Sequence, residues 1–354
     1  MKPLFILSFA LIFTSCKQES LVGINNQTQT ALPSDQQKAM VAAAADDWVW
    51  TGNQASNQIE IYDPAVADWN SASALKWSWK PVTTKGYSQY AVDHWGLPTD
   101  FKVRTVSTWG GNHLVSSCSN GLVTIAAYPA GTKKWAYNLG FNPHGVELLP
   151  NGNIAVAATD KDSVLLFASS TGTDNLVHAA VRLNKAHSVL YDPVENILWA
   201  TGNDFVIAMQ VGGTNSAPTL TELPARRGLL NTTSSANPYG HDLSRDLGDN
   251  NILWIGTNGG AYSYNKTTKV FTNGPGGATG INKTMIKAIS RQNSGLFVIT
   301  RPDSEKTTEL PDPVTDPTWC TRYVDFYSSA GVFQYYRTKS GAKFYRAKIF
   351  RTPY

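Results

Sequence analysis

A short apolar strand that ends in Thr or Ser and runs into a turn recurs along this chain, and the recurrence limits the folds open to it. A second strand and then a weaker third strand follow each copy, and most copies are spaced by roughly 40 to 55 residues. The hydrophobic pattern has a period of two and turn signals lie close together, which predicts an all-β domain. The copies are "WVWTGN" (Thr51), "HLVSSCSNG" (Ser119), "IAVAATD" (Thr159), "ILWATGN" (Thr201), "ILWIGTNG" (Thr257) and "LFVITR" (Thr300).

A fourth strand precedes every copy except the first. The C-terminal segment "AKFYRAKIFRTPY" resembles these leading strands and has no unit of its own. Placed in the first unit, it would remove two exposed sheet edges at once. We therefore predict six four-stranded blades that the C-terminal strand closes into a ring, with seven blades as the alternative. The leading strands are "FKVRTVST", "PHGVELL", "AHSVLYD", "YGHDLSR" and "MIKAISR".

This arrangement resembles the β-propeller superfamily over residues 45–354. The turn in "LPNGNIAVA" is similar to turns in lactonase-type and NHL-type propellers, and the chain resembles uncharacterised propeller lipoproteins of Bacteroidota-type bacteria. In layout it is also similar to propeller-type polysaccharide lyases, in which channel histidines bind a metal. No motif of those lyases matches residue by residue, so this last resemblance implies no catalytic assignment.

The N-terminus has the pattern of a targeting signal. The apolar run from Leu4 to Phe13 is too short to span a bilayer and is typical of a signal peptide. The small residues before Cys16 resemble a bacterial lipobox, which implies cleavage before Cys16 and its lipidation, although Phe13 stands where that motif usually has Leu. An ordinary secretory signal with an incidental cysteine is the alternative. We predict a lipoprotein signal peptide at 1–16, a flexible tether at 17–44 and one propeller domain at 45–354, lipid-anchored in the cell envelope at the outer membrane or cell surface.

Charge and cysteine content narrow the possible partners. The formal net charge of +4 is mild and no Lys/Arg run is present, so we expect no nucleic-acid partner. We expect membrane contact through the lipid anchor only, and a monomer. Cys118 and Cys320 lie far apart in sequence, and two buried free thiols are the simpler interpretation.

Each leading strand carries a basic residue in the pattern [His/Arg/Lys]-x-[Val/Leu/Ile], between 13 and 16 residues before the Thr or Ser. Leading strands line the channel of a propeller, so these side chains should form a ring at the channel end where the Thr residues lie. The expected ring consists of Arg104, His144, His187, His241 and Lys287, with Arg346 or Lys348 in sixth place.

Long loops are predicted on the same face as this ring, and long loops crowded on one rim usually build a binding site. They comprise residues 82–100, 225–238, 276–284 and 301–319. Tyr90, Trp95 and Arg301 on these loops are candidate ligand-binding residues, together with the ring residues Arg104, Lys287 and Arg346.

Two kinds of chemistry are compatible with such a ring. His144, His187 and His241 could converge on a divalent metal with positions left open for substrate. The neighbouring cations argue against a metal and favour an anion site, in which Arg and Lys hold a carboxylate or sulfate. One of the three histidines or Tyr239 could then act as a general base for β-elimination.

We therefore predict a lipid-anchored propeller that binds an anionic small molecule or an acidic glycan fragment in its central channel. Metal-assisted turnover of the lyase type is one extension of this prediction, and whether the protein is an enzyme stays open. The alternative is a non-catalytic propeller scaffold for protein–protein interaction, because a fold alone does not define a function.

Overall fold

Six antiparallel sheets make up the computed structural model, which describes residues 46–230, 238–310 and 319–352. Each sheet is a blade of four strands, and blade four carries one further short strand, β16 (Gly228–Leu229), beside its third strand. The predicted six-bladed propeller is confirmed. The predicted signal peptide, Cys16 and the tether lie outside the described residues.

The strands of each blade run in sequence order from the channel outward, except in blade one. The inner strands are β25 (Phe344–Ile349), β4 (Pro98–Thr105), β8 (Pro143–Leu148), β12 (Ser188–Asp192), β17 (Gly240–Arg245) and β21 (Ala288–Arg291). The second strands are β1 (Val49–Asn53), β5 (Asn112–Cys118), β9 (Ile154–Ala158), β13 (Ile197–Thr201), β18 (Ile252–Thr257) and β22 (Phe297–Thr300).

The outer half of each blade is equally regular. The third strands are β2 (Gln58–Tyr62), β6 (Leu122–Tyr128), β10 (Ser163–Phe167), β14 (Phe205–Gly213), β19 (Ala261–Asn265) and β23 (Tyr323–Tyr327). The outer strands are β3 (Leu75–Trp79), β7 (Lys133–Asn138), β11 (His178–Arg182), β15 (Pro218–Glu222), β20 (Phe271–Asn273) and β24 (Phe333–Thr338).

Helical structure in the described residues is confined to loops. One short α-helix, α2 (Gln89–Asp93), starts at Ser88, whose side chain accepts a hydrogen bond from the Ala91 amide. Single 3-10 turns lie at η1 (Thr83–Lys85), η2 (Ser107–Trp109), η3 (Thr159–Lys161), η4 (Ser169–Thr171), η5 (Pro224–Arg226), η6 (Gly277–Thr279) and η7 (Asp303–Glu305). None of the helices in the described parts has the length and hydrophobicity that a membrane crossing requires.

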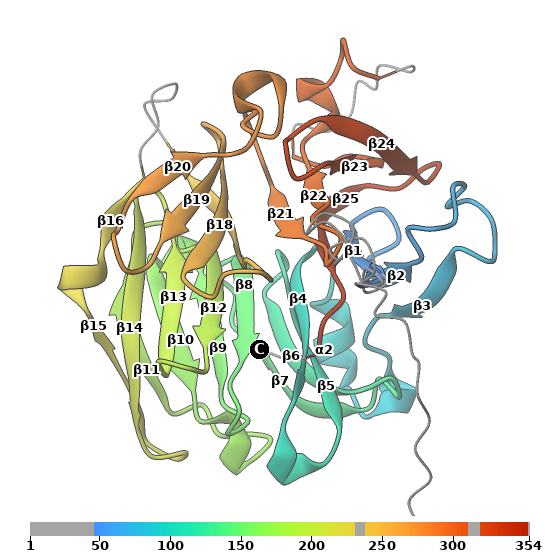
Figure 1. Cartoon of the computed structure of the whole chain (residues 1–354). Helices are drawn as coiled ribbons and strands as arrows, with labels where there is room; N and C mark the ends of the chain where they lie inside the picture. Colours follow the sequence, from blue (N-terminus) through green and yellow to red (C-terminus); the bar gives the residue numbers. More distant parts are fainter. Residues whose placement is uncertain (1–45, 231–237, 311–318, 353–354) are drawn as a thin grey trace, which may run out of the picture. The chain divides into compact units, whose positions relative to one another are not determined.

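The ring closes through β25, as the leftover C-terminal strand predicted. β25 pairs antiparallel with β1 and supplies the inner strand of blade one, and Figure 1 shows these segments from opposite ends of the chain side by side. Neighbouring inner strands also contact one another all the way round, from β25 through β4, β8, β12, β17 and β21 back to β25. An exposed edge at the channel is thereby avoided.

The hydrophobic core is divided into six layers, one between each pair of neighbouring blades. β9 shows why its sequence, "IAVAA", is apolar at every position. Ile154 and Val156 pack toward blade two, whereas Ala155 and Ala157 pack toward blade four. Because successive strand residues point to opposite faces, a strand sandwiched between two blades must be apolar on both.

Cys118 and Cys320 are buried and form no disulfide with each other, which confirms the prediction of two separate thiols. Burial raises the pKa of the Cys118 thiol, which keeps it protonated and unreactive near neutral pH.

Candidate functional site

His144, His187, His241 and Lys287 lie at one level of the channel, as the ring prediction required. The amide of His187 donates to the Thr201 carbonyl at 2.8 Å, and the amide of Lys287 donates to the Thr300 carbonyl at 2.9 Å. Ring and Thr residues therefore share one end of the channel, which we call the histidine end.

A repeated backbone turn fixes this level. In blades two to six, the residue two positions before the ring residue has a left-handed conformation, with φ between 45° and 58°. The turn redirects the incoming loop into the inner strand, and its recurrence shows which residues are equivalent among the blades. The left-handed residues are Leu97, Asn142, Lys185, Tyr239 and Met285.

This turn shows that the predicted place of Arg104 is wrong. The ring residue of blade two is Thr99, two positions after Leu97, and its hydroxyl donates to the Pro143 carbonyl at 2.7 Å. Arg104 pairs with His113 near the far end of β4. Arg104 is five positions after Thr99 on the same strand, so the two lie roughly 16 Å apart along the channel.

The predicted place of Arg346 is also wrong. Blade one contributes Tyr345 to the ring, and its hydroxyl lies 2.9 Å from Nε2 of His187. The Arg346 side chain is fully buried and lies deeper in the channel than the ring. The pairing of β25 with β1 shifts register between Thr51 and Asn53, at the level of Tyr345 and Arg346. Because of this shift, Tyr345 takes the place in the ring that simple alternation along the strand would give to Arg346.

The three histidines form one packed cluster. The rings of His144 and His187 stack with centroids 4.2 Å apart, and His187 contacts His241 edge-on at 4.9 Å. Tyr239 is half-buried and its ring lies 5.0 Å from that of His187 and 5.1 Å from that of His241. Tyr239 is thus in the cluster, as predicted for a candidate base.

Hydrogen bonds orient only part of this cluster. Nδ1 of His144 faces the Asn142 carbonyl at 2.9 Å and the Thr159 hydroxyl at 3.1 Å. Nδ1 of His187 and Nδ1 of His241 are buried and have no hydrogen-bond partner within the described residues. Two buried ring nitrogens thus keep their hydrogen-bonding capacity for something else.

The histidines are held neutral. Burial is the main cause and lowers the pKa of His144 from 6.5 to about 3, with the charge of Arg346 as the next contribution. Burial likewise holds the pKa values of His187 and His241 well below 6.5, and cationic neighbours add to the effect. Burial also lowers the pKa of Lys287 to about 7, again with help from Arg346.

The residues do not fit a metal centre. In the described part of the chain, no group of three or more His, Cys, Asp or Glu is arranged to hold an ion. Nε2 of His241 faces the amine of Lys287 at 2.8 Å and Oδ1 of Asn258 at 2.7 Å, so this nitrogen is already engaged. We therefore derive no chemistry through a bound metal.

Below the ring, an ion-pair network fills the channel. The guanidinium of Arg346 lies 3.4 Å from Asp100 and 3.8 Å from Asp242. Lys348 joins the same two carboxylates at 2.9 Å and 2.6 Å, and Lys102 pairs with Asp100 at 2.8 Å. Burial opposes the charge of Asp100, but Lys102, Lys348 and Arg346 hold its pKa far below the usual range. This network separates the two ends of the channel.

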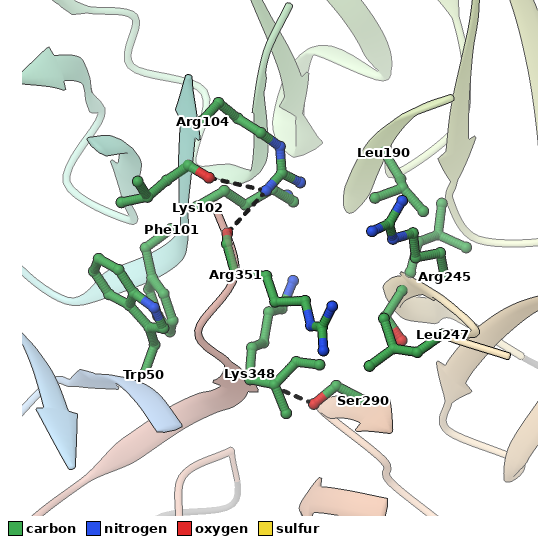
Figure 2. Close-up of a pocket in the computed structure, with 14 residues that line it drawn as sticks. Trp50, Phe101, Lys102, Arg104, Leu190, Arg245, Leu247, Ser290, Lys348 and Arg351 are labelled. Carbon is green, nitrogen blue, oxygen red and sulfur yellow. Dashed lines mark hydrogen bonds between the residues drawn. The ribbon is translucent and has the colours of Figure 1, made fainter. Parts of the chain in front are cut away.

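The opposite end of the channel opens into a pocket, which we call the arginine pocket (Figure 2). The pocket encloses about 640 Å³, counting its open mouth, and has five basic and no acidic lining residues. Figure 2 shows Arg104 on β4, Arg245 on β17 and Arg351 on the segment after β25 around this pocket. Its lining consists of Trp50, Phe101, Lys102, Val103, Arg104, Leu190, Leu243, Ser244, Arg245, Leu247, Ser290, Lys348, Ile349 and Arg351.

Most cations of the arginine pocket have a carboxylate partner behind the wall. Arg104 binds Glu147 through two nitrogens, at 2.9 Å and 3.1 Å, and Arg351 binds Asp47 at 2.8 Å. The half-buried guanidinium of Arg245 makes no ion pair or hydrogen bond with any residue that the structure describes. Burial and the charges of Arg104 and Arg351 lower the pKa of Arg245.

Of the other predicted ligand-binding residues, only Tyr90 is exposed on a loop. It lies on α2, and its hydroxyl accepts a hydrogen bond from Asn138 at 2.9 Å. Trp95 is buried in the core layer between blades one and two, where its indole donates to the Asn57 carbonyl. Its predicted role in the wall of a site is therefore wrong.

Arg301 also differs from its predicted role. Its guanidinium is buried and donates to the carbonyls of Thr284 and Glu305 and to the Glu309 carboxylate. Since the guanidinium is buried and each of its nitrogens already has a partner within the protein, Arg301 fastens the loop that follows β22.

Sequence counting missed most of the arginine pocket. It identified Arg104, but placed it at the wrong end, and it overlooked Arg245 and Arg351. A signal for the correct register was present in "GLPTD", where Pro98-Thr99 matches Pro143-His144 of "NPHGV". A signal for Arg245 was its position four residues after the ring residue His241, at the far end of the same inner strand.

Six four-stranded antiparallel blades around a channel, closed by the C-terminal strand, define this chain as a six-bladed β-propeller. More specifically, the chain belongs to a family described as "Family of unknown function (DUF6528)", whose model matches residues 9–309. No curated protein matches the chain.

Two solved structures illustrate the similarity in fold. A protein of unknown function from Bacteroides caccae has 11% identity and a TM-score of 0.51, with 87% of this chain and 100% of that chain covered. Virginiamycin B lyase from Staphylococcus aureus has 14% identity and a TM-score of 0.47, with 83% and 81% covered. At these identities the likeness concerns the fold alone.

Proposed function

We propose that this protein binds an anionic small molecule or an acidic glycan fragment in the arginine pocket, with Arg245 as the main anchor. The observation that carries the proposal is the unpaired guanidinium of Arg245 beside two further arginines. A half-buried cation without a counter-charge is costly, and a bound anion would remove that cost.

The chemistry of the pocket favours a carboxylate or a sulfate as the anion. Guanidinium groups bind such planar or tetrahedral oxyanions through two parallel hydrogen bonds. Arg104 and Arg351 are committed to Glu147 and Asp47, so they add positive potential more than new bonds. Arg245 has its donors available and provides the directional contact.

The remaining walls suit the body of a small molecule. Leu190, Leu243 and Leu247 line one side, and Trp50 stacks on Phe101 at 6.1 Å on the other. Ligand sites commonly combine apolar walls with a few placed polar groups. The apolar face of a sugar ring, or a hydrocarbon stem, would be accommodated between these walls.

The arrangement supports binding more than turnover. β-Elimination requires a general base beside the group that neutralises the carboxylate. His144, His187, His241 and Tyr239, the candidate bases, belong to the histidine end, and the ion-pair network of Arg346 lies between them and the pocket. The pocket lining contains no His, Asp, Glu, Tyr or Cys within the described residues.

The cellular setting is part of the same proposal. The lipobox pattern before Cys16 supports a lipid anchor in the cell envelope, and the tether at 17–44 would hold the propeller away from the membrane surface. Metabolic labelling with a fatty-acid probe should mark the wild-type protein and not a Cys16→Ala variant. Equal labelling of the two would refute the anchor and leave the pocket proposal intact.

Isothermal titration with acidic and neutral oligosaccharides of equal length tests the binding function. We expect oligogalacturonates or sulfated oligosaccharides to bind, neutral galacto-oligosaccharides to bind at least tenfold more weakly, and rising salt to weaken the acidic ligands. Arg245→Gln should reduce affinity roughly tenfold or more, because one charge-assisted contact contributes about 1.5–3 kcal/mol. This variant should keep its stability, since the substitution relieves repulsion from Arg104 and Arg351.

Arg226→Gln is the matched control. Arg226 is paired with Glu195 at 2.6 Å outside the pocket lining, so its loss should leave affinity unchanged. Equal binding of acidic and neutral ligands, or equal effects of both variants, would contradict the proposal. Absence of any binding would favour the scaffold alternative, in which the propeller rim binds another protein.

A further inference from the structure

The histidine end contains a second cluster of reactive groups that anion binding in the arginine pocket does not use. We propose that Lys287 is a nucleophilic lysine that forms a Schiff base with a small aldehyde or ketone, with His241 as the proton acceptor. This site is independent of the arginine pocket and lies at the other end of the channel.

The first observation is the local contact of the amine. Nζ of Lys287 lies 2.8 Å from Nε2 of His241, and it forms no ion pair with a carboxylate of the described residues. Lysines buried in proteins usually pair with a carboxylate, as Lys306 does with Asp325 at 3.1 Å. Lys287 therefore lacks the partner that would keep it as a structural ammonium.

The second observation is the charge around the amine. Arg346 lies beneath it on β25 and His241 faces it from β17, while Cys320 and Glu305 are the groups whose fields oppose the effect of Arg346. Burial and Arg346 lower the pKa of Lys287 from 10.5 to about 7, so much of the amine is neutral at physiological pH. A desolvated lysine beside another cation is the usual way to activate an amine.

The third observation is the freedom of His241 to change tautomer. Its Nδ1 is buried without a hydrogen-bond partner in the described residues, so this nitrogen is able to carry the ring proton. Nε2 also lies 2.7 Å from Oδ1 of Asn258, and a lone pair on Nε2 requires that the amide of Asn258 turn its nitrogen toward the ring. With the proton on Nδ1, Nε2 presents a lone pair toward Lys287 and accepts a proton from it. The unpartnered Nδ1 of His187 lies in the same cluster and is available to a polar atom of the bound carbonyl compound.

The covalent step is balanced without any further reactant. The neutral amine of Lys287 attacks the carbonyl carbon, a C–N bond forms, and the π electrons of the carbonyl move to oxygen. Nε2 of His241 takes one proton from the nitrogen and returns it to the oxygen, giving a carbinolamine. Loss of water, with a second proton leaving the nitrogen, gives the C=N bond, and the net change is amine plus carbonyl to imine plus water.

The low exposure of the amine restricts the carbonyl compound to a small one. Lys287 and His241 are 5% and 4% exposed, and the half-buried ring of Tyr239 lies beside them.

Reductive trapping on the full-length protein tests the assignment. The protein is incubated with glycolaldehyde and sodium cyanoborohydride between pH 6 and 10, and the extent of modification at each lysine is measured by peptide mass spectrometry. The neutral fraction of an amine with pKa near 7 exceeds that of an ordinary lysine about a thousandfold at pH 7, so even with restricted access we expect Lys287 to react at least tenfold faster than exposed Lys161. Its rate should level off above pH 8, whereas that of Lys161 should keep rising.

Variants separate chemistry from folding. His241→Asn should slow trapping at Lys287 several-fold without affecting Lys161, because the proton acceptor is lost and the amine remains. Lys287→Met should remove the fast-reacting site, while Arg245→Gln should leave it unchanged. Trapping at Lys287 no faster than at Lys161 in the wild-type protein, or a rate that rises only above pH 9, would overturn the proposal without any variant having to fold.

Discussion

His144 offers a direct test of whether the histidine end is neutral. Its ring is 9% exposed, and burial together with Arg346 lowers its pKa from 6.5 to about 3. The unfolded chain takes up a proton at this side chain near pH 6.5, but the folded chain does so only near pH 3. The stability that the neutral ring provides is therefore complete above pH 6.5 and is lost as the pH falls toward 3.

The size of the loss follows from proton linkage. At pH 4.5 the histidine is about 99% protonated in the unfolded chain and mostly neutral in the folded one. Between pH 7 and pH 4.5 this residue alone should lower the free energy of unfolding by about 2.5 kcal/mol. Because pH 4.5 lies well above the pKa of His144 in the folded chain, the decrease in the free energy of unfolding depends only on the pKa in the unfolded chain and on the pH.

The perturbation is His144→Gln, which has an amide in place of the ring beside the Asn142 carbonyl and the Thr159 hydroxyl and cannot titrate. Urea unfolding followed by tryptophan fluorescence at several pH values from 7 to 4.5 measures the effect. Between those two limits the wild type should lose about 2.5 kcal/mol more than the variant.

The control for this experiment is His178→Gln, which removes an exposed histidine on β11 and should follow the wild-type profile. Parallel profiles for wild type and His144→Gln would refute the argument that burial keeps the histidine cluster neutral.

Two further predictions concern the scaffold. Deleting residues 343–354 removes β25, the inner strand of blade one, and should abolish cooperative unfolding in circular dichroism, whereas deleting only 352–354 should leave it intact. Asp100→Asn removes a buried carboxylate that pairs with Lys102, Lys348 and Arg346, and it should lower the free energy of unfolding by about 3–5 kcal/mol in the same urea assay. The control Asp160→Asn breaks an exposed pair with Lys185 and should change the free energy of unfolding by less than about 1 kcal/mol.

The strands were predictable because the pattern that signals them is local. In β9 and β13, every residue is buried between two blades, so apolar runs of about five residues bounded by turns are physically required. The leftover strand at the C-terminus was equally informative, since an unpaired strand edge is unfavourable and only blade one lacked a member.

The ring membership could not be read by counting, because the strands and the turns between them differ in length from blade to blade. In blade two, β4 and β5 have eight and seven residues, whereas β8 and β9 of blade three have six and five. The longer strands, with a turn one residue longer, give Arg104 the count that His144 has in blade three. The pattern "RTV" imitates "HGV" although the two tripeptides lie at opposite ends of their strands. A residue-by-residue count measures chain length, whereas the ring is defined by strand pairing.

The partners of the charged side chains could not be predicted from the sequence, for a different reason. Whether an arginine is available depends on carboxylates that approach from other blades, such as Glu147 on β8 for Arg104. The basic residues of the chain therefore include paired cations that stabilise the fold and one unpaired cation, Arg245, that is suited to bind a ligand.

The two ends of the channel differ in charge, and the buried cation of Arg346 contributes to this difference. Arg346 is held by Asp100 and Asp242, and its guanidinium, which stays charged, needs these carboxylates to remain buried. Burial is the main cause of the lowered pKa values of Lys287 and His144, and the charge of Arg346 adds to it, so this end of the channel favours a neutral amine and neutral imidazoles. At the other end Arg245 and Arg351 are half-buried, so solvent screens their repulsion, and the buried Arg104 is paired with Glu147, which allows these cations to remain charged together. An anion is therefore expected to prefer the arginine pocket, and an uncharged electrophile the histidine end.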